Sequence, residues 1–204
     1  MRLEPRTVFS PSFAIDEPVL QFLGNDTTRL GRADIGCLLI NSADDSSVVS
    51  SALRAAVGLD FPLEAGTIVN AYPRRVLWLT PRSWLLHCLV EEECVLATRI
   101  NDAFPDKRVH AAVFTDCLCW FELCGLQGLD QLTNGGFISL ERDGLKVGHV
   151  KRTSIAGIAA VVVHLQSATW LLGIDRSRAM YFKEWLQAGR SVQDLPSQSR
   201  HPNR

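Results

Sequence analysis

The stretch Trp78-Leu79-Thr80-Pro81-Arg82-Ser83-Trp84-Leu85-Leu86 is the most informative part of this chain. Two tryptophans and three leucines flank a short Thr-Pro-Arg-Ser turn. An apolar run, a breaker and a second apolar run are typical of two neighbouring strands, or of one strand that enters a bend. By itself this pattern predicts buried core and no chemistry.

Composition limits the class of protein. The chain has 204 residues, of which 47% are hydrophobic, so it can bury a substantial core in one domain or in two tightly packed subdomains. A net charge of -1 gives no basic surface for nucleic acid. The sequence contains no run of about 18 apolar residues, so it predicts no membrane span. Residues 1–18 lack the apolar centre of a secretory signal. We therefore expect a cytoplasmic protein.

The first half of the chain predicts strands and two helices. The expected strands cover residues 37–40, 67–71, 75–79 and 84–89. Asp44, Asp45 and Ser46 are candidate caps for a helix that stops at Gly58. A second helix is expected to begin at three glutamates, residues 91–93, and to end before Pro105.

The second half is expected to repeat this order of strands and helices. Strands are expected at residues 109–115, 118–124, 147–153, 157–165 and 169–174, and a short helix at 126–133. Ser177 is the expected cap of a last helix, whose apolar stripe is Phe182, Trp185 and Leu186.

Several expected strands follow directly on one another, which favours an α+β fold with largely antiparallel sheets over a doubly wound parallel sheet. We expect two mixed sheet-and-helix subdomains, at residues 37–106 and 107–189. An N-terminal arm, residues 1–36, precedes them, and a disordered polar tail, residues 190–204, follows. The arm either becomes ordered on a partner or is an irregular segment that packs on its own domain.

The cysteines do not predict a metal site. Six cysteines lie mostly in apolar runs, as buried free thiols do. Cys117-x-Cys119-x4-Cys124 is their only cluster. If it is a strand, Cys117 and Cys119 share one face and Cys124 points to the other, unlike the ligands of a structural zinc site.

The sequence has no motif for a nucleophile and no glycine-rich phosphate loop. We therefore predict no catalytic, cofactor-binding or metal-binding residues on this chain. Arg152 and Arg176 are candidates to pair with a carboxylate of a substrate or a partner chain. A local Asp175–Arg176 pair beside the Ser177 cap is the alternative.

The chain is rich in tryptophan, a residue of cores and of stable interfaces. Trp78, Trp84 and Trp185 are therefore candidate structural or interface residues, together with the two arginines.

Four motifs in this order resemble the gamma subunit of heterotetrameric sarcosine oxidase. They are residues 78–86, Thr115-Asp116 before the strand with Phe121-Glu122-Leu123, the strand with Gly148 and Arg152-Thr153, and Arg176-Ser177 leading into Tyr181-x-x-x-Trp185-Leu186. The resemblance covers roughly residues 59–189. Thr80, Arg82-Ser83 and Cys117 depart from the usual family pattern, which suggests a complex that oxidises a related N-methyl amine.

The resemblance implies a fold similar to the folate-binding aminomethyltransferases of the glycine cleavage system. It also implies a cytoplasmic complex with alpha, beta and delta subunits, which oxidatively demethylates sarcosine to glycine and yields hydrogen peroxide and methylenetetrahydrofolate. FAD, FMN, NAD, tetrahydrofolate and zinc would belong to the other subunits, and no family catalytic residue maps onto this chain. The expected role is a non-catalytic structural subunit. The alternatives are a stand-alone folate-binding or aminomethyltransferase-like protein and an unrelated binding module that self-associates.

Overall fold

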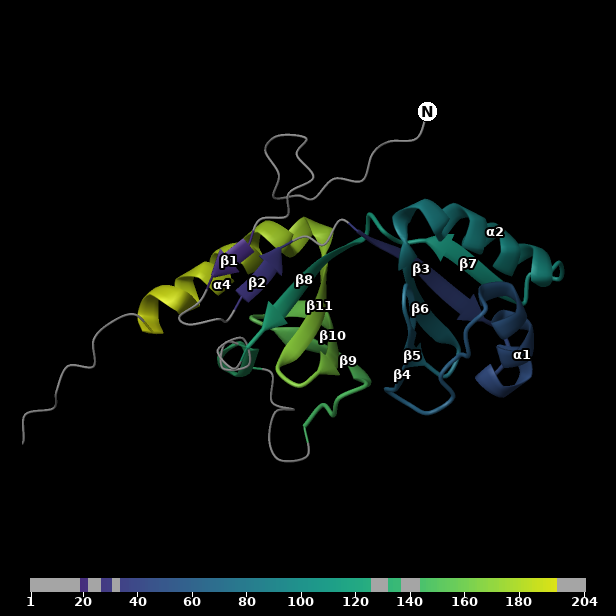
Figure 1. Cartoon of the computed structure of the whole chain (residues 1–204), viewed down its shortest axis with the longest axis horizontal. Coiled ribbons are helices and arrows are strands. Elements are labelled where there is room, and N and C mark those ends of the chain that lie inside the picture. The colour runs from purple at the N-terminus through teal and green to yellow at the C-terminus, as the bar shows by residue number, and fades with distance from the viewer. Residues whose placement is uncertain (1–18, 22–26, 31–33, 126–131, 137–143, 194–204) are drawn as a thin grey trace, which may run out of the picture.

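The structure is a computed structural model, and it describes residues 19–21, 27–30, 34–125, 132–136 and 144–193. Two antiparallel sheets lie face to face, with helices on the two outer sides (Figure 1). No helix among these residues is long and apolar enough to cross a membrane.

The five-stranded sheet contains the two strands that flank the Thr-Pro-Arg-Ser turn. Its strand order is β4 (Ile68–Ala71), β5 (Arg74–Thr80), β6 (Ser83–Leu89), β3 (Ile35–Ser42) and β7 (Val109–Val113). Trp78 and Trp84 face each other across the β5–β6 hairpin, and the register shifts between Trp78 and Thr80. The two apolar runs are therefore two strands joined by a tight turn, as one of the two interpretations predicted.

Two helices cover the outer face of this sheet. They are α1 (Ser46–Val57) and α2 (Glu93–Ala103), the latter preceded by the 3-10 turn η1 (Val90–Glu92). Gly58 ends α1 in the left-handed conformation, with φ of 77°, so the predicted stop is confirmed. Asp45 occupies the N-cap position of α1, but its side chain makes no capping hydrogen bond.

The six-stranded sheet takes its strands from both ends of the chain. Its order is β1 (Val19–Gln21), β2 (Thr27–Leu30), β8 (Leu118–Cys124), β11 (Thr169–Asp175), β10 (Ile158–Gln166) and β9 (His149–Ile155). The helix α4 (Ala179–Gln193) follows the 3-10 turn η3 (Arg176–Arg178) and covers the outer face.

Three apolar clusters hold these layers together. One packs the five-stranded sheet against α1 and α2, with Leu53 and Ile100 fully buried. A second packs the six-stranded sheet against α4 through Phe182 and Leu186. A third joins the sheets to each other. Its members come from both sheets: Cys37, Leu77, Leu85, Trp120, Val150, Val163 and Leu171. The two halves of the chain thus share one inter-sheet core.

The edges of the two sheets also meet through the backbone. Thr67 and His149 form an isolated antiparallel bridge. Beside it, the Ile68 N–H donates to the Gly148 carbonyl at 3.0 Å, and the Val150 N–H donates to the Gly66 carbonyl at 2.7 Å.

The two sheets repeat one strand order, as the sequence predicted for the halves. The order β4-β5-β6-β3-β7 in one sheet corresponds to β9-β10-β11-β8-β2 in the other. The correspondence is complete only because β2, from the N-terminal segment, occupies the position that β7 occupies in the first sheet. β1 then adds a sixth strand.

The sheets do not follow the expected boundaries. The segment 1–36, expected to be a separate arm or an irregular segment packed on its own domain, contributes β1 and β2 to the second sheet and the start of β3 to the first. β7 follows residue 106 but belongs to the first sheet, because it pairs with β3. A local sequence pattern predicts that a segment is a strand, but it does not predict which other strand it pairs with. In both cases the strand itself is local, and what differs from the expectation is the sheet in which it pairs.

Two further expectations concern helices. α4 continues to Gln193, past Gly189, so the first residues of the expected tail are helical and the remainder lies outside the described residues. Most of the expected helix at 126–133 also lies outside them. Within that segment, the described residues 132 and 133 are helical.

Candidate functional site

Trp84 is a core residue and is not available to a partner. Its side chain is fully buried in the cluster below α1 and α2. Its indole N–H donates to the Pro62 carbonyl at 3.4 Å, and Phe61 packs edge-on against its ring with the centroids 5.6 Å apart. Trp78, opposite on β5, is partly buried against the same cluster.

Trp185 is also explained by packing. It lies half-buried on α4, and its ring stacks on that of Phe182 with the centroids 5.4 Å apart. A Cβ atom added to Gly135 would lie 2.8 Å from the Trp185 ring, so this glycine permits the close approach. Trp120 and Trp170 are buried too. The tryptophan side chains of this chain are therefore mainly core residues and contribute little exposed surface.

Arg176 joins two parts of the chain that are distant in sequence. Its Nη1 lies 2.9 Å from Oδ1 of Asp116, in the turn before β8. Its backbone N–H donates to the Cys117 carbonyl at 3.0 Å. The pairing of Arg176 with the adjacent Asp175, one of the two sequence-based interpretations, does not occur in these contacts. Arg176 instead fixes the start of η3 against the connection between the two sheets.

Asp175, and not Ser177, caps the turn that leads into α4. The Asp175 Oδ1 atom accepts from the Ser177 N–H at 2.8 Å and from its hydroxyl at 2.5 Å. The prediction that Ser177 is the cap was wrong, because a strand that ends in aspartate places its own carboxylate over the following N–H groups. The Ser177 hydrogen bonds lower the pKa of the Asp175 carboxyl, with a smaller contribution from Arg178.

Arg152 lies in the middle of β9 and does not close a strand, as expected, because β9 continues to Ile155. β9 is an edge strand of its sheet, and Arg152 is exposed there. Strand alternation places it on the same face as Val150, which packs in the inter-sheet core. Arg152 forms no ion pair with a described residue.

The described cysteines do not form a metal site. Cys117 is exposed in the turn before β8, whereas Cys119 is buried inside that strand, so the two do not share a strand face as expected. Burial raises the pKa of the Cys88 and Cys119 thiols to about 12. Cys94 and Cys117 are exposed and Cys124 is half-buried, so the prediction of buried thiols holds for three of six. Among the described residues no group of three or more His, Cys, Asp or Glu side chains could hold a metal ion.

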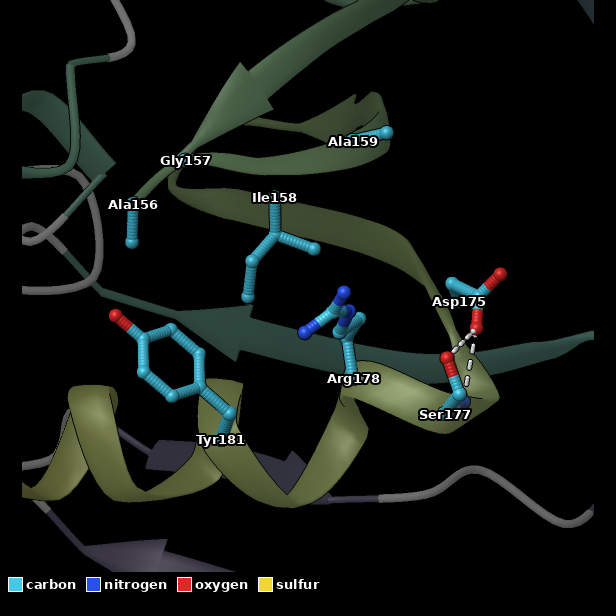
Figure 2. Close-up of a pocket in the computed structure, with 8 residues that line it drawn as sticks. All are labelled: Ala156, Gly157, Ile158, Ala159, Asp175, Ser177, Arg178 and Tyr181. Carbon is cyan, nitrogen blue, oxygen red and sulfur yellow. Dashed lines mark hydrogen bonds between the residues drawn. The ribbon is translucent and has the colours of Figure 1, made fainter.

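A pocket of about 590 Å³ lies where α4 begins (Figure 2). Its lining combines the β9–β10 turn, the start of β10 and the turn η3. The residues are Ala156, Gly157, Ile158, Ala159, Asp175, Ser177, Arg178 and Tyr181.

The geometry of this pocket places two long side chains around an apolar floor. Figure 2 shows the Arg178 guanidinium and the Tyr181 ring on either side of Ile158, with the tyrosine hydroxyl toward Ala156. Ile158 is buried, whereas both flanking side chains are exposed. The sequence analysis singled out Arg176 and missed Arg178. The signal that could have found it is position, because Arg178 immediately precedes α4, whose first turn carries Tyr181.

These features define a class: an α+β protein of two repeated antiparallel-sheet units, with a surface pocket where the last helix begins. The chain belongs to the sarcosine oxidase gamma subunit family, whose family model matches residues 41–192, well over half of its length. No curated protein sequence matches the chain.

Two solved structures share the fold. Heterotetrameric sarcosine oxidase from Corynebacterium sp. U-96, solved in complex with pyrrole 2-carboxylate, matches with a TM-score of 0.74 at 21% identity, over 84% of this chain and 87% of that one. Glycine cleavage system aminomethyltransferase T from Bartonella henselae matches with a TM-score of 0.55 at 10% identity. That alignment covers 75% of this chain but only 43% of the aminomethyltransferase, so the chain spans less than half of that protein's length.

Proposed function

We propose that this chain is a non-catalytic structural subunit of a cytoplasmic heterotetramer with alpha, beta and delta subunits. The complex oxidises sarcosine to glycine. The methyl carbon passes to tetrahydrofolate as the methylene derivative, and oxygen accepts the two electrons and becomes hydrogen peroxide. The observation that carries the proposal is the family match over residues 41–192, which includes strands of both sheets.

The chemistry of the described residues supports a structural role. His87 is the buried polar side chain of the core, and it packs edge-on against Trp120 with the ring centroids 4.3 Å apart. The buried thiols are held protonated by desolvation, which disfavours them as nucleophiles. We therefore propose that FAD, FMN, NAD, tetrahydrofolate and zinc are bound by the other subunits.

Affinity purification tests the assignment. The tagged full chain is purified from its native host, the proteins that accompany it are identified by mass spectrometry, and the visible spectrum of the eluate is recorded. We expect two large partners and one small one, and a flavin spectrum that sarcosine bleaches. A colourless protein that elutes alone would overturn the proposal. Bleaching by another N-methyl amine but not by sarcosine would assign the complex to a related substrate.

The likeness to an aminomethyltransferase makes folate binding the second function to test. Equilibrium dialysis of the purified chain against a reduced folate measures it directly. Under our proposal the isolated chain retains no folate above a serum albumin control. Stoichiometric binding would replace the structural role with a folate-binding one.

A further inference from the structure

Two histidines lie opposite each other on the helix-covered face of the six-stranded sheet. His149 of β9 pairs with His164 of β10, and His164 pairs in turn with Trp170 of β11. Trp170 belongs to the core cluster beneath α4, so the side chains of this row face that side of the sheet. Side chains directly opposite on antiparallel strands begin about 4.5–5.5 Å apart at Cβ. The two imidazole rings are therefore within reach of one small ligand.

Hydrogen bonds to the backbone fix the tautomer of both rings. The His164 Nδ1 atom lies 2.7 Å from the Leu145 carbonyl oxygen, and the His149 Nδ1 atom lies 3.2 Å from that of Val147. A carbonyl oxygen only accepts, so each Nδ1 donates and each neutral ring keeps its lone pair on Nε2. Both carbonyls belong to the segment that leads into β9. Both rings therefore direct Nδ1 toward that segment and Nε2 away from it.

The Nε2 atom of His164 has no hydrogen-bond partner in the described part of the chain, although it is buried. The ring stacks on Trp170, with the centroids 5.0 Å apart and the planes 18° apart, so its orientation is fixed. A metal-binding histidine has the same arrangement, because its other nitrogen donates to a backbone carbonyl and orients the lone pair. His149, on the edge strand β9, is partly exposed and gives an ion a route from solvent.

We propose that His149 and His164 bind one divalent transition-metal ion through their Nε2 atoms. Imidazole nitrogen suits Zn²⁺, Cu²⁺ and Ni²⁺, and water fills the remaining coordination positions. This pair is smaller than the groups of three or more ligands excluded above. Two protein ligands hold an ion less firmly than the four of a structural zinc site, and Lys151, on the same face of β9, adds a repulsive charge. The bound ion is therefore exchangeable, and the proposal is independent of any metal on other subunits.

His87 is more deeply buried, but it does not form such a pair. Its cross-strand neighbours are Arg75 of β5 and Cys37 of β3. A guanidinium has no lone pair to offer a metal ion. Burial raises the pKa of the Cys37 thiol well above its ordinary value, so this thiol stays protonated and is a poor ligand. His110, exposed on β7 opposite Asn41, is likewise without a second imidazole across the strand and serves as a control.

Calorimetric titration with Zn²⁺ tests the site in the untagged full chain. Cys94→Ser and Cys117→Ser are introduced into every sample, because these exposed thiols also bind zinc. We expect one Zn²⁺ per chain, with an affinity that His149→Phe and His164→Phe each lower at least about tenfold. Phenylalanine keeps an aromatic ring at each position but offers no nitrogen. His110→Ala is expected to change the affinity by less than about twofold, and thermal melting confirms that each variant is folded.

NMR of isotope-labelled histidine reports on the site even if one variant fails to fold. Zn²⁺ is expected to shift the Nε2 resonances of His149 and His164, to leave Nδ1 of both rings protonated, and to leave His110 unshifted. The proposal is overturned if the chain shows no saturable binding of Zn²⁺, or if a folded Phe variant keeps the affinity of its parent. A shift at only one of the two histidines would also overturn it.

Discussion

Asp175 sets how the last strand turns into α4, and its carboxylate makes this turn sensitive to pH. Hydrogen bonds from the Ser177 hydroxyl and N–H lower its pKa in the folded chain. A lowered folded pKa means that the contribution to stability is present above the unfolded pKa of about 3.9 and is lost as the pH falls through the folded value.

Ser177→Ala is therefore expected to raise the pKa of Asp175 toward its ordinary value, because one of the two donors disappears. NMR titration of the Asp175 side-chain carboxyl carbon measures this pKa. Ser154→Ala, at an exposed position of β9, serves as the control and should leave the Asp175 pKa unchanged. An unchanged pKa in Ser177→Ala would show that the backbone N–H alone holds the carboxylate.

Position 173 requires a glycine because the Trp120 ring on the neighbouring strand leaves no room for a side chain. Gly173 pairs with Trp120 in the β8–β11 register, and an added Cβ atom would lie 2.7 Å from the Trp120 Cη2 atom. Trp120 is buried in the inter-sheet core and has little room to move. Gly173→Ala is therefore expected to lower the free energy of unfolding by about 1–3 kcal/mol in a denaturant titration.

Trp120→Phe provides the matched test of this clash. The atoms nearest the added Cβ are Cη2, Cζ3 and Cζ2 of the indole, all of which phenylalanine lacks. The Trp120 indole N–H has no hydrogen-bond partner among the described residues, so Trp120→Phe removes volume but no such bond. The double variant should be more stable than the sum of the single effects predicts. Simple additivity would assign the loss in Gly173→Ala to another cause.

Local sequence predicted which residues matter better than it predicted what they contact. Arg176 was predicted to pair with a carboxylate of a substrate or a partner chain, or with Asp175, whereas the structure pairs it with Asp116, 60 residues earlier in the chain. No local pattern states that the turn before β8 returns to the start of η3. Trp84 stood out as an apolar residue beside a turn, and only packing shows that α1 and α2 cover it completely.

At the scale of elements, α2 protects the open edge of its sheet. β7 is the outer strand, and such strands offer unpaired backbone groups to other chains. The Asn101 amide of α2 donates to the Ala111 carbonyl at 3.0 Å and accepts from the Ala111 N–H at 2.9 Å. One side chain thus satisfies both outward backbone groups of a residue that is 2% exposed.

Asn101→Ala is expected to lower the free energy of unfolding by about 1–3 kcal/mol, because it leaves both groups of Ala111 unsatisfied. It should also increase aggregation, measured by light scattering during refolding. The control is Asn70→Ala, at an exposed position of β4 where no hydrogen bond to a described residue is lost. Equal effects of the two variants would contradict edge protection by Asn101.

The glutamates at residues 91–93 and the proline at residue 105 predicted the helix α2, in which Leu96 and Ile100 form a buried apolar stripe. Asn101 follows that stripe directly, but nothing in the sequence marked it, because a polar residue on a helix is usually solvated. Its role depends on the pairing of β7 with β3, a contact between segments about 70 residues apart.

At the scale of the whole molecule, the chain crosses between its two repeats. β2 precedes the first sheet in sequence but pairs with β8 in the second, in the position that β7 holds in the first. Each sheet also has its own helix-side core, beyond the core that they share. This arrangement predicts that loss of the N-terminal strands weakens one sheet selectively.

A chain that begins at Ile35 tests this prediction. It retains β3 and the complete five-stranded sheet, but it loses the four residue pairs between β2 and β8. At about 1 kcal/mol for each ladder hydrogen bond, we expect the six-stranded sheet to lose about 2–4 kcal/mol of stability.

Hydrogen exchange detected by mass spectrometry measures both sheets in one sample, so the five-stranded sheet is the internal control. Peptides from β8 and β11 should exchange faster, while those from β5 and β6 remain protected. Equal loss of protection in both sheets would show that the shared inter-sheet core makes the two repeats unfold as one unit.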